Sequence, residues 1–176
     1  GKMGEAIPYF EKAASLVDAD YHSTGMLQTC YGAIGDAEGM QRAARMTLER
    51  TQRVLAQDPS TGSALGFGAT ALAALGDRDR AKEWIKRALL MDPDNFTMRW
   101  NLTCALSCYL GDKEGAIELL ETFVDRAPPA MVKYLRLDTD LDPLRDDPRF
   151  ESLVAGAERR IAATRAGPAH AAASAS

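Results

Sequence analysis

The chain has 176 residues, 26% of them charged and 46% apolar, and its formal net charge at pH 7 is −4. This composition gives no electrostatic reason to expect a nucleic acid or an anionic membrane as a partner, and no apolar run approaches the roughly 20 residues of a transmembrane helix. Three cysteines are an odd number, which argues against a disulfide framework, and no secretory signal is recognisable, so we expect a cytoplasmic protein.

Residues 1–20 predict a single helix. Its apolar residues recur at the spacing of one helical face: Ala6, Ile7, Phe10, Ala13 and Leu16. The helix that should precede this one and cover its apolar face is missing. We therefore expect the chain to be a fragment of a longer protein, or another protomer to cover this end.

A glycine followed by an aspartate recurs three times: Gly35–Asp36, Gly76–Asp77 and Gly111–Asp112. Glycine suits the left-handed turn that ends one helix, and aspartate is a favourable N-cap for the next. After the second pair, small and large apolar residues alternate on one helical stripe: Ala81, Trp84, Ile85, Ala88 and Leu89. The pattern predicts helical hairpins over residues 21–60, 61–95 and 96–129.

Three local features depart from a regular repeat. The interval from Gly35 to Pro59 is about two helical turns longer than the corresponding intervals later in the chain, so we expect one overlong helix over residues 36–57. Gly66 and Gly68 lie inside a predicted helix, where close approach of a neighbouring backbone would compensate for a cost of about 1 kcal/mol each. The glycine of the third pair comes one residue late, so we expect a slight slip of the helical register before it.

The pattern changes after residue 129. Residues 130–137 predict a short helix, residues 138–148 an acidic turn with prolines, and residues 149–165 a final helix. We expect residues 130–165 to form the atypical unit that caps a stack of repeats. The low-complexity residues 166–176 are expected to be a poorly ordered tail.

Residues at equivalent places in these helices carry a family resemblance. An alanine is followed four residues later by a large apolar residue, and prolines end the units: Ala6 and Phe10, Ala81 and Ile85, Ala116 and Leu120, and Pro59, Pro93 and Pro128. The chain thereby resembles tetratricopeptide repeat (TPR) arrays, whose helix–turn–helix unit of about 34 residues has an Ala…Phe…Pro second half. The resemblance implies an all-α fold, a TPR-like α–α superhelix built as a right-handed solenoid of helical hairpins. It would cover residues 1–165, with a leading half-repeat at 1–20.

Two segments resemble a narrower group of proteins. Leu75–Asp94 and Asp140–Phe150 are similar to the C-terminal repeat regions of bacterial multidomain signalling proteins, which often follow class III adenylate/guanylate cyclase, winged-helix or TolB-like modules. The chain contains none of the cyclase's own catalytic motifs, so the resemblance implies no enzymatic activity. It implies a protein-interaction or regulatory scaffold within a larger signalling protein, with an accessory region of a nucleotide cyclase as a less favoured interpretation.

Two motifs that imitate ligand sites have structural explanations. Residues 66–71 fit a loose dinucleotide-binding string, but they lie inside a predicted helix instead of between a strand and a helix. Asp138, Asp140 and Asp142 imitate the start of a calcium loop, whose later glycine and glutamate positions hold a proline and an arginine in this chain. We expect these aspartates to cap helices and to accept hydrogen bonds from turn amides.

The remaining reactive and charged side chains give no enzyme signature. Cys104 and Cys108 share a helix face and Cys30 lies in another repeat, but zinc needs about four ligands and the chain has only two histidines. No serine or cysteine has a recognisable activating histidine and carboxylate. We expect a protein without catalytic activity, cofactor or metal. We expect a basic strip on the long helix to be a solvated outer face: Arg42, Arg45, Arg50 and Arg53.

The first helices of the repeats are the best candidate for a binding surface, because TPR proteins line their concave face with them. The candidates are mostly small or weakly polar: His22, Thr29, Ser63, Thr70, Trp100, Asn101, Cys104 and Lys133. The cluster of Lys, Arg and Asn with which chaperone-binding members hold a C-terminal carboxylate is missing, so we expect no such binding. The predicted partner is a protein or peptide, either intramolecular or intermolecular. The alternative is a homo-oligomerisation module, a homodimer formed through the uncovered Ile7 and Phe10.

Overall fold

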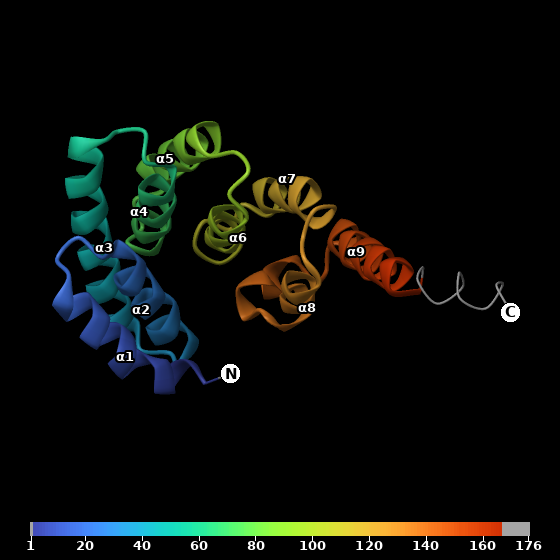
Figure 1. The fold of residues 1–176 in the computed structure, drawn as a ribbon, viewed down its shortest axis with the longest axis horizontal. Helices are drawn as coiled ribbons and strands as arrows, with labels where there is room; N and C mark the ends of the chain where they lie inside the picture. The colour runs from blue at the N-terminus through green and yellow to red at the C-terminus, as the bar shows by residue number, and fades with distance from the viewer. Residues whose placement is uncertain (1, 167–176) are drawn as a thin grey trace, which may run out of the picture. The chain divides into compact units, whose positions relative to one another are not determined.

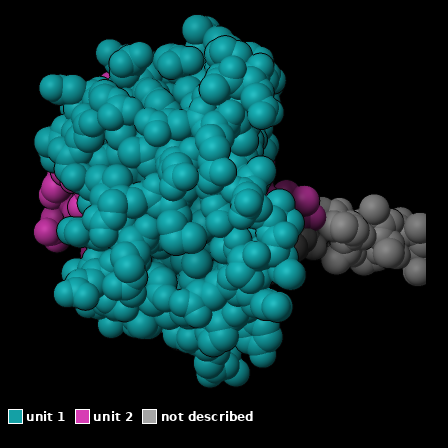
Figure 2. Space-filling model, turned by 90° about the vertical axis from the view of Figure 1, so that its left-hand side faces the viewer, with its two compact units in different colours: residues 1–105 teal, residues 106–176 magenta. Residues whose placement is uncertain are grey.

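A computed structural model describes residues 2–166 of the chain. Within that range the secondary structure is helical, which confirms the expected all-α fold. Figure 1 shows the helices in chain order. The chain divides into two compact units, residues 1–105 and residues 106–176 (Figure 2). Apart from Ala166, the tail predicted at residues 166–176 lies outside the described residues.

The first unit contains a leading helix, two helical hairpins and the first helix of a third. The helices are α1 (Met3–Leu16), α2 (Tyr21–Ala33), α3 (Ala37–Gln57), α4 (Gly62–Ala74), α5 (Arg78–Met91) and α6 (Phe96–Cys104). Each helix packs against the next from α1 to α5. The first helices also pack against one another, because α4 contacts both α2 and α6. This row of first helices forms the surface that the sequence assigns to binding.

The helix boundaries follow the predicted punctuation. Gly35, Gly76 and Gly111 adopt positive φ angles of 77°, 84° and 58°, where an L side chain would be strained. In each case the carboxylate of the following aspartate accepts a hydrogen bond from the backbone N–H three residues later, as an N-cap does. The local turns between helices are therefore set by short-range hydrogen bonds that the sequence makes visible.

Helix α3 confirms the predicted overlong helix, with 21 residues. The expectation for its basic strip is wrong at one position. Arg42 and Arg53 are exposed and pair with glutamates one turn away, and Arg45 is also exposed. Arg50 is only 8% exposed, because its guanidinium reaches back to the end of α1 and donates to the carbonyl oxygens of Ala14 (2.9 Å), Val17 (3.2 Å) and Asp20 (2.9 Å).

The two glycines inside α4 are crowded by side chains of neighbouring helices. A Cβ atom on Gly66 would lie 2.6 Å from Cγ of Met98, and one on Gly68 would lie 2.3 Å from Cζ3 of Trp84. The expectation that a neighbouring backbone approaches these glycines is therefore wrong. The atoms closest to them belong to the side chains of Met98 on α6, Trp84 on α5 and Thr51 on α3. Large side chains can be buried here because the glycines leave room for them.

The alanines of α5 allow equally close packing. Ala81 and Ala88 are both 0% exposed. We expect Ala81→Leu to lower the free energy of unfolding by about 1–2 kcal/mol, because the added carbons have no space in a close-packed interface. Urea unfolding followed by circular dichroism measures this change. The exposed Leu90, replaced by alanine, serves as a surface control on the same helix, and an equal effect of both variants would contradict the prediction.

The slip before the third glycine is a one-residue insertion in the helix. Residues Ala105–Tyr109 form a π-helix, η1, which is a common way to hold an extra residue within a helix. At the two earlier pairs, the aspartate N–H donates to a carbonyl five residues back, that of Tyr31 or Leu72. In the third pair, the N–H of Asp112 donates to the carbonyl of Leu106, six residues back, at 2.8 Å. The predicted register slip is confirmed.

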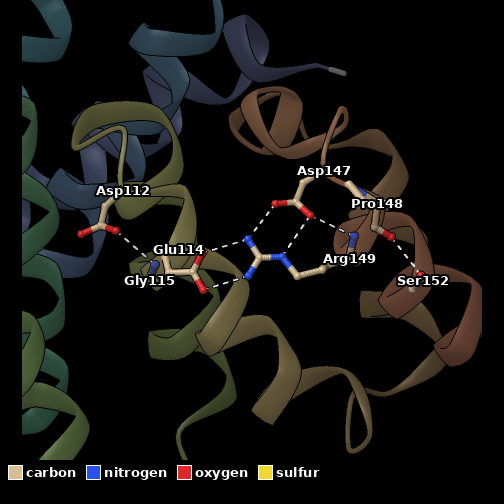
Figure 3. Close-up of polar contacts among 7 residues, drawn as sticks. All are labelled: Asp112, Glu114, Gly115, Asp147, Pro148, Arg149 and Ser152. Carbon is tan, nitrogen blue, oxygen red and sulfur yellow. Dashed lines mark hydrogen bonds and ion pairs between the residues drawn. The ribbon is translucent and has the colours of Figure 1, made fainter.

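The second unit contains α7 (Lys113–Val124), α8 (Pro129–Leu137), the 3-10 helix η2 (Thr139–Leu144) and α9 (Pro148–Ala166). An ion-pair network joins the starts of α7 and α9 (Figure 3). The guanidinium of Arg149 contacts the carboxylate of Glu114 at 2.8 Å and 2.9 Å and that of Asp147 at 2.8 Å. These hydrogen bonds hold the pKa of Glu114 and of Asp147 below their usual values.

Nearer the end of α9, Arg160 donates to the carbonyl oxygens of Val124 and Ala127, so it caps α7 as Arg50 caps α1.

Candidate binding surface on the first helices

The predicted binding residues lie mainly in the first unit. His22 and Thr29 lie on α2, Ser63 and Thr70 on α4, and Trp100, Asn101 and Cys104 on α6. We call this the α2–α4–α6 surface. Lys133 lies in the second unit, where it is exposed on α8.

A pocket of about 330 Å³ opens in this surface. It is lined by His22 of α2, by residues of α4 and α6, and by the N-cap of α6: His22, Ser63, Gly66, Phe67, Asn95, Thr97, Met98 and Asn101. We call these eight residues the neutral pocket, because the lining contains no lysine, arginine, aspartate or glutamate. The pocket brings together three of the predicted binding residues, His22, Ser63 and Asn101.

The other predicted residues of this surface lie outside the pocket lining. The hydroxyl of Thr29 donates to the carbonyl of Gly25 and that of Thr70 to the carbonyl of Gly66, so both are used within their own helices. Cys104 is 7% exposed and Trp100 is half-buried. These four residues do not line the pocket.

Sequence reasoning missed Phe67 and Met98, which form the apolar part of the lining. The spacing carries a partial signal. Ser63 and Phe67 are one helical turn apart on α4, and Thr97 and Asn101 are one turn apart on α6, so each pair shares a helix face. Which face of α6 meets which face of α4 depends on packing between helices, and no local pattern shows it.

Two lining rings, those of His22 and Phe67, contact each other and the ring of Tyr21. The His22 ring stacks on Tyr21 with 4.3 Å between centroids, and meets Phe67 edge-on at 4.9 Å. Tyr21 is 8% exposed, and its hydroxyl lies 2.8 Å from the hydroxyl of Ser63 in a hydrogen bond. Phe67 also packs so closely on Gly25 that a Cβ atom there would lie 2.3 Å from its ring. The aromatic side of the pocket is therefore held in place by buried contacts.

In the acidic turn of the second unit, the role predicted for the three aspartates is confirmed at Asp138, which is the N-cap of η2. Asp138 accepts a hydrogen bond from the N–H of Asp140 at 3.0 Å, and Asp142 pairs with Arg145. Burial, together with the nearby carboxylates of Asp138 and Asp142, raises the pKa of Asp140 to about 6. Burial, with a contribution from Asp140, also raises the pKa of the Cys108 thiol to about 12, so this thiol is not an activated nucleophile.

The raised pKa of Asp140 predicts a pH-dependent stability. The folded protein holds this proton more tightly than the unfolded chain, so the stability that depends on it is complete at low pH and declines as the pH rises through about 6. We expect Asp140→Asn to raise the free energy of unfolding by up to about 3 kcal/mol near neutral pH and to have little effect near pH 4. Urea unfolding at both pH values tests this. Asp146→Asn, at an exposed position between η2 and α9, is the control, and a gain from Asp140→Asn that is equal at both pH values would refute the prediction.

One segment of the chain matches a family of repeat proteins. Residues 69–95 match the tetratricopeptide repeat family model. This segment contains the end of α4 and the whole of α5. Similar solved structures include the nearly identical TPR-like repeats of a Podosopora anserina protein described as a kinesin light chain, at 17% identity, covering 94% of this chain and 90% of that chain with a TM-score of 0.49. A variant of the same Podosopora anserina repeats gives 18% identity, 94% and 89% coverage and a TM-score of 0.49.

No curated protein matches the chain. TPR-family proteins are generally non-catalytic scaffolds, and their repeats generally bind proteins or peptides. Among residues 2–166, no helix combines the length and apolar character that a membrane crossing requires.

Proposed function

We propose that the chain is a non-catalytic protein-interaction module that binds a peptide segment of a partner on the α2–α4–α6 surface. The neutral pocket carries this proposal, because it is the place where residues from three first helices meet around one hollow. The TPR match at residues 69–95 supports the same function. In this proposal the partner peptide lies across α2, α4 and α6 and inserts a side chain into the pocket.

A single surface substitution tests the proposal. Thr97 is exposed at the pocket, so Thr97→Arg places a bulky side chain in the hollow without disturbing the core. The matched control is Gln52→Arg on α3, since Gln52 is exposed, lies outside the pocket and undergoes the same change of charge. Peptides are selected from a phage-displayed library of random linear sequences against the purified chain. We expect Thr97→Arg to weaken the selected peptides about tenfold or more, or about 1.4 kcal/mol, and Gln52→Arg to leave them unchanged.

Two results would reject the proposal. One is a selection that enriches no peptide. The other is a set of peptides that bind Thr97→Arg as tightly as the original chain. Thermal unfolding of both variants shows whether a loss of binding reflects a loss of folding.

We also propose a setting for the module, as part of a larger protein. The resemblance of Leu75–Asp94 and Asp140–Phe150 to repeat regions of bacterial signalling proteins supports a regulatory role within a larger cytoplasmic signalling protein. An accessory role beside a nucleotide cyclase is a narrower form of it. Cyclase activity of a protein that contains this chain, measured with and without Thr97→Arg, tests that form, and unchanged activity would remove it.

Homo-oligomerisation through α1 is a second candidate function. Ile7 and Phe10 are half-buried, because they pack against Ala14, Leu27 and Ala43 of the same chain. The most exposed large apolar residues of α1 are Tyr9, at 78%, and Leu16, at 68%. If α1 forms a homodimer, light scattering will give a molecular mass that rises with concentration and falls in a Tyr9→Glu variant. A concentration-independent monomer would reject it.

A further inference from the structure

We propose that the neutral pocket receives a tyrosine side chain of the bound peptide and excludes charged side chains, including phosphotyrosine. This inference rests on the proposed function and names the chemistry of the side chain that the same pocket takes. Three properties of the pocket lead to it: its charge, its aromatic side and its unengaged polar groups.

The lack of acidic and basic residues in the lining excludes ionic side chains from the pocket. A carboxylate, a phosphate or an ammonium group that enters the pocket loses hydration, and the lining offers no residue of opposite charge, because it contains neither carboxylates nor lysine or arginine. Uncompensated transfer of a charge out of water is strongly unfavourable. The pocket therefore selects uncharged side chains.

The apolar part of the lining fits an aromatic ring. The rings of Phe67 and His22 lie on one side of the pocket, with 4.9 Å between their centroids. This contact holds the two rings in place. Met98, 4% exposed, contributes a thioether side chain. Rings favour offset or edge-to-face contact with other rings, and methionine sulfur makes favourable contacts with ring edges. The volume of about 330 Å³ is at the lower end of the range for ligand pockets, about 300–1,000 Å³, which suits one side chain.

The polar part of the lining distinguishes tyrosine from phenylalanine. Asn95 is already engaged, since it accepts from the N–H of Met98 at 2.9 Å and donates to Asp92 at 2.8 Å. Within residues 2–166, the side chains of Thr97 and Asn101 make no hydrogen bond, although both line the pocket. A phenol hydroxyl both donates and accepts, so it can bond to the amide and to the hydroxyl. Phenylalanine offers neither group a hydrogen bond.

Small amino-acid probes test this inference directly. N-acetyl-tyrosinamide, N-acetyl-phenylalaninamide and N-acetyl-phosphotyrosinamide are titrated into the full chain, and amide chemical shifts are followed by NMR. We expect the tyrosine probe to bind with a dissociation constant in the millimolar range and to shift the amides of Ser63, Phe67, Met98 and Asn101. The phenylalanine probe should bind about threefold to tenfold more weakly, and the phosphorylated probe should give no saturable shift.

A variant of the polar lining separates recognition from folding. Asn101→Leu keeps a side chain of similar size, and we expect it to bring the ratio of tyrosine to phenylalanine affinity close to one while the phenylalanine probe still binds. Thr97→Arg should abolish binding of both probes, and Gln52→Arg should change neither. A lost fold would instead weaken both probes together and would appear in the thermal unfolding of the variant.

The outcomes distinguish this inference from the proposed function. Peptides that bind through the pocket but carry no tyrosine, together with no shift from the tyrosine probe, overturn the inference and leave the interaction module intact. Equal affinity of the phosphorylated probe also overturns it. Shifts confined to residues outside the eight lining residues overturn it as well. Selected peptides with a tyrosine whose replacement by phenylalanine weakens binding to the original chain, but not to Asn101→Leu, support it.

Discussion

Replacing Arg50 by methionine is expected to lower the free energy of unfolding of the first unit by about 2–4 kcal/mol. Methionine retains the length of the aliphatic chain but loses the hydrogen bonds to the carbonyl oxygens of Ala14, Val17 and Asp20. Hydrogen bonds from a charged donor contribute about 1.5–3 kcal/mol each, and a buried acceptor without a partner is costly. Part of this is offset, because the guanidinium no longer has to be desolvated.

The control for this change lies three residues away on the same helix. The side chain of Arg53 is 56% exposed and pairs with an exposed Glu49 at 3.5 Å, so Arg53→Met should cost at most about 0.5 kcal/mol. Urea unfolding measures both variants. Hydrogen exchange adds a local measurement, because amides near the end of α1 should lose protection in Arg50→Met alone. Similar costs for the two arginines would show that Arg50 does not hold the end of α1.

The second large effect is expected from Gly68→Leu, at about 3 kcal/mol or more of lost stability. A Cβ atom at this position would lie 2.3 Å from Cζ3 of Trp84 and 2.9 Å from the hydroxyl of Thr51. Trp84 is 9% exposed and Thr51 is 0% exposed, so neither can move into solvent without loss of packing. Overpacking of this kind costs about 1–3 kcal/mol for small additions and more where no space exists.

Gly156, another glycine inside a helix, is the control, because a side chain added there has space. At Gly156 in α9, the nearest atom to an added Cβ is 4.0 Å away. Leucine has a better helix propensity than glycine, so Gly156→Leu should be neutral or should stabilise the chain by up to about 1 kcal/mol. Thermal and urea unfolding compare the two variants. Loss of stability by the same amount at both glycines would mean that crowding around Trp84 does not explain the role of Gly68.

The candidate pocket was only partly predictable. His22, Ser63 and Asn101 could be placed on one surface, because helical spacing assigns each to a face of a first helix. Phe67 and Met98 were missed, since a large apolar residue in a helix is usually a core residue. Lys133, predicted for the far end of the same surface, lies on α8 of the second unit.

The sequence by itself determined the local structure. The glycine–aspartate pairs, the long α3 and the late third glycine all act through hydrogen bonds and residue spacing within a few helical turns, so the sequence displays them directly. Tertiary structure alone decided the roles of Arg50, Gly68 and Phe67. Arg50 cannot be distinguished from Arg53 by local sequence, because its partners lie 30 to 36 residues earlier. Such contacts are set by how helices distant in sequence pack together, and only the folded chain brings those groups within hydrogen-bonding or van der Waals distance.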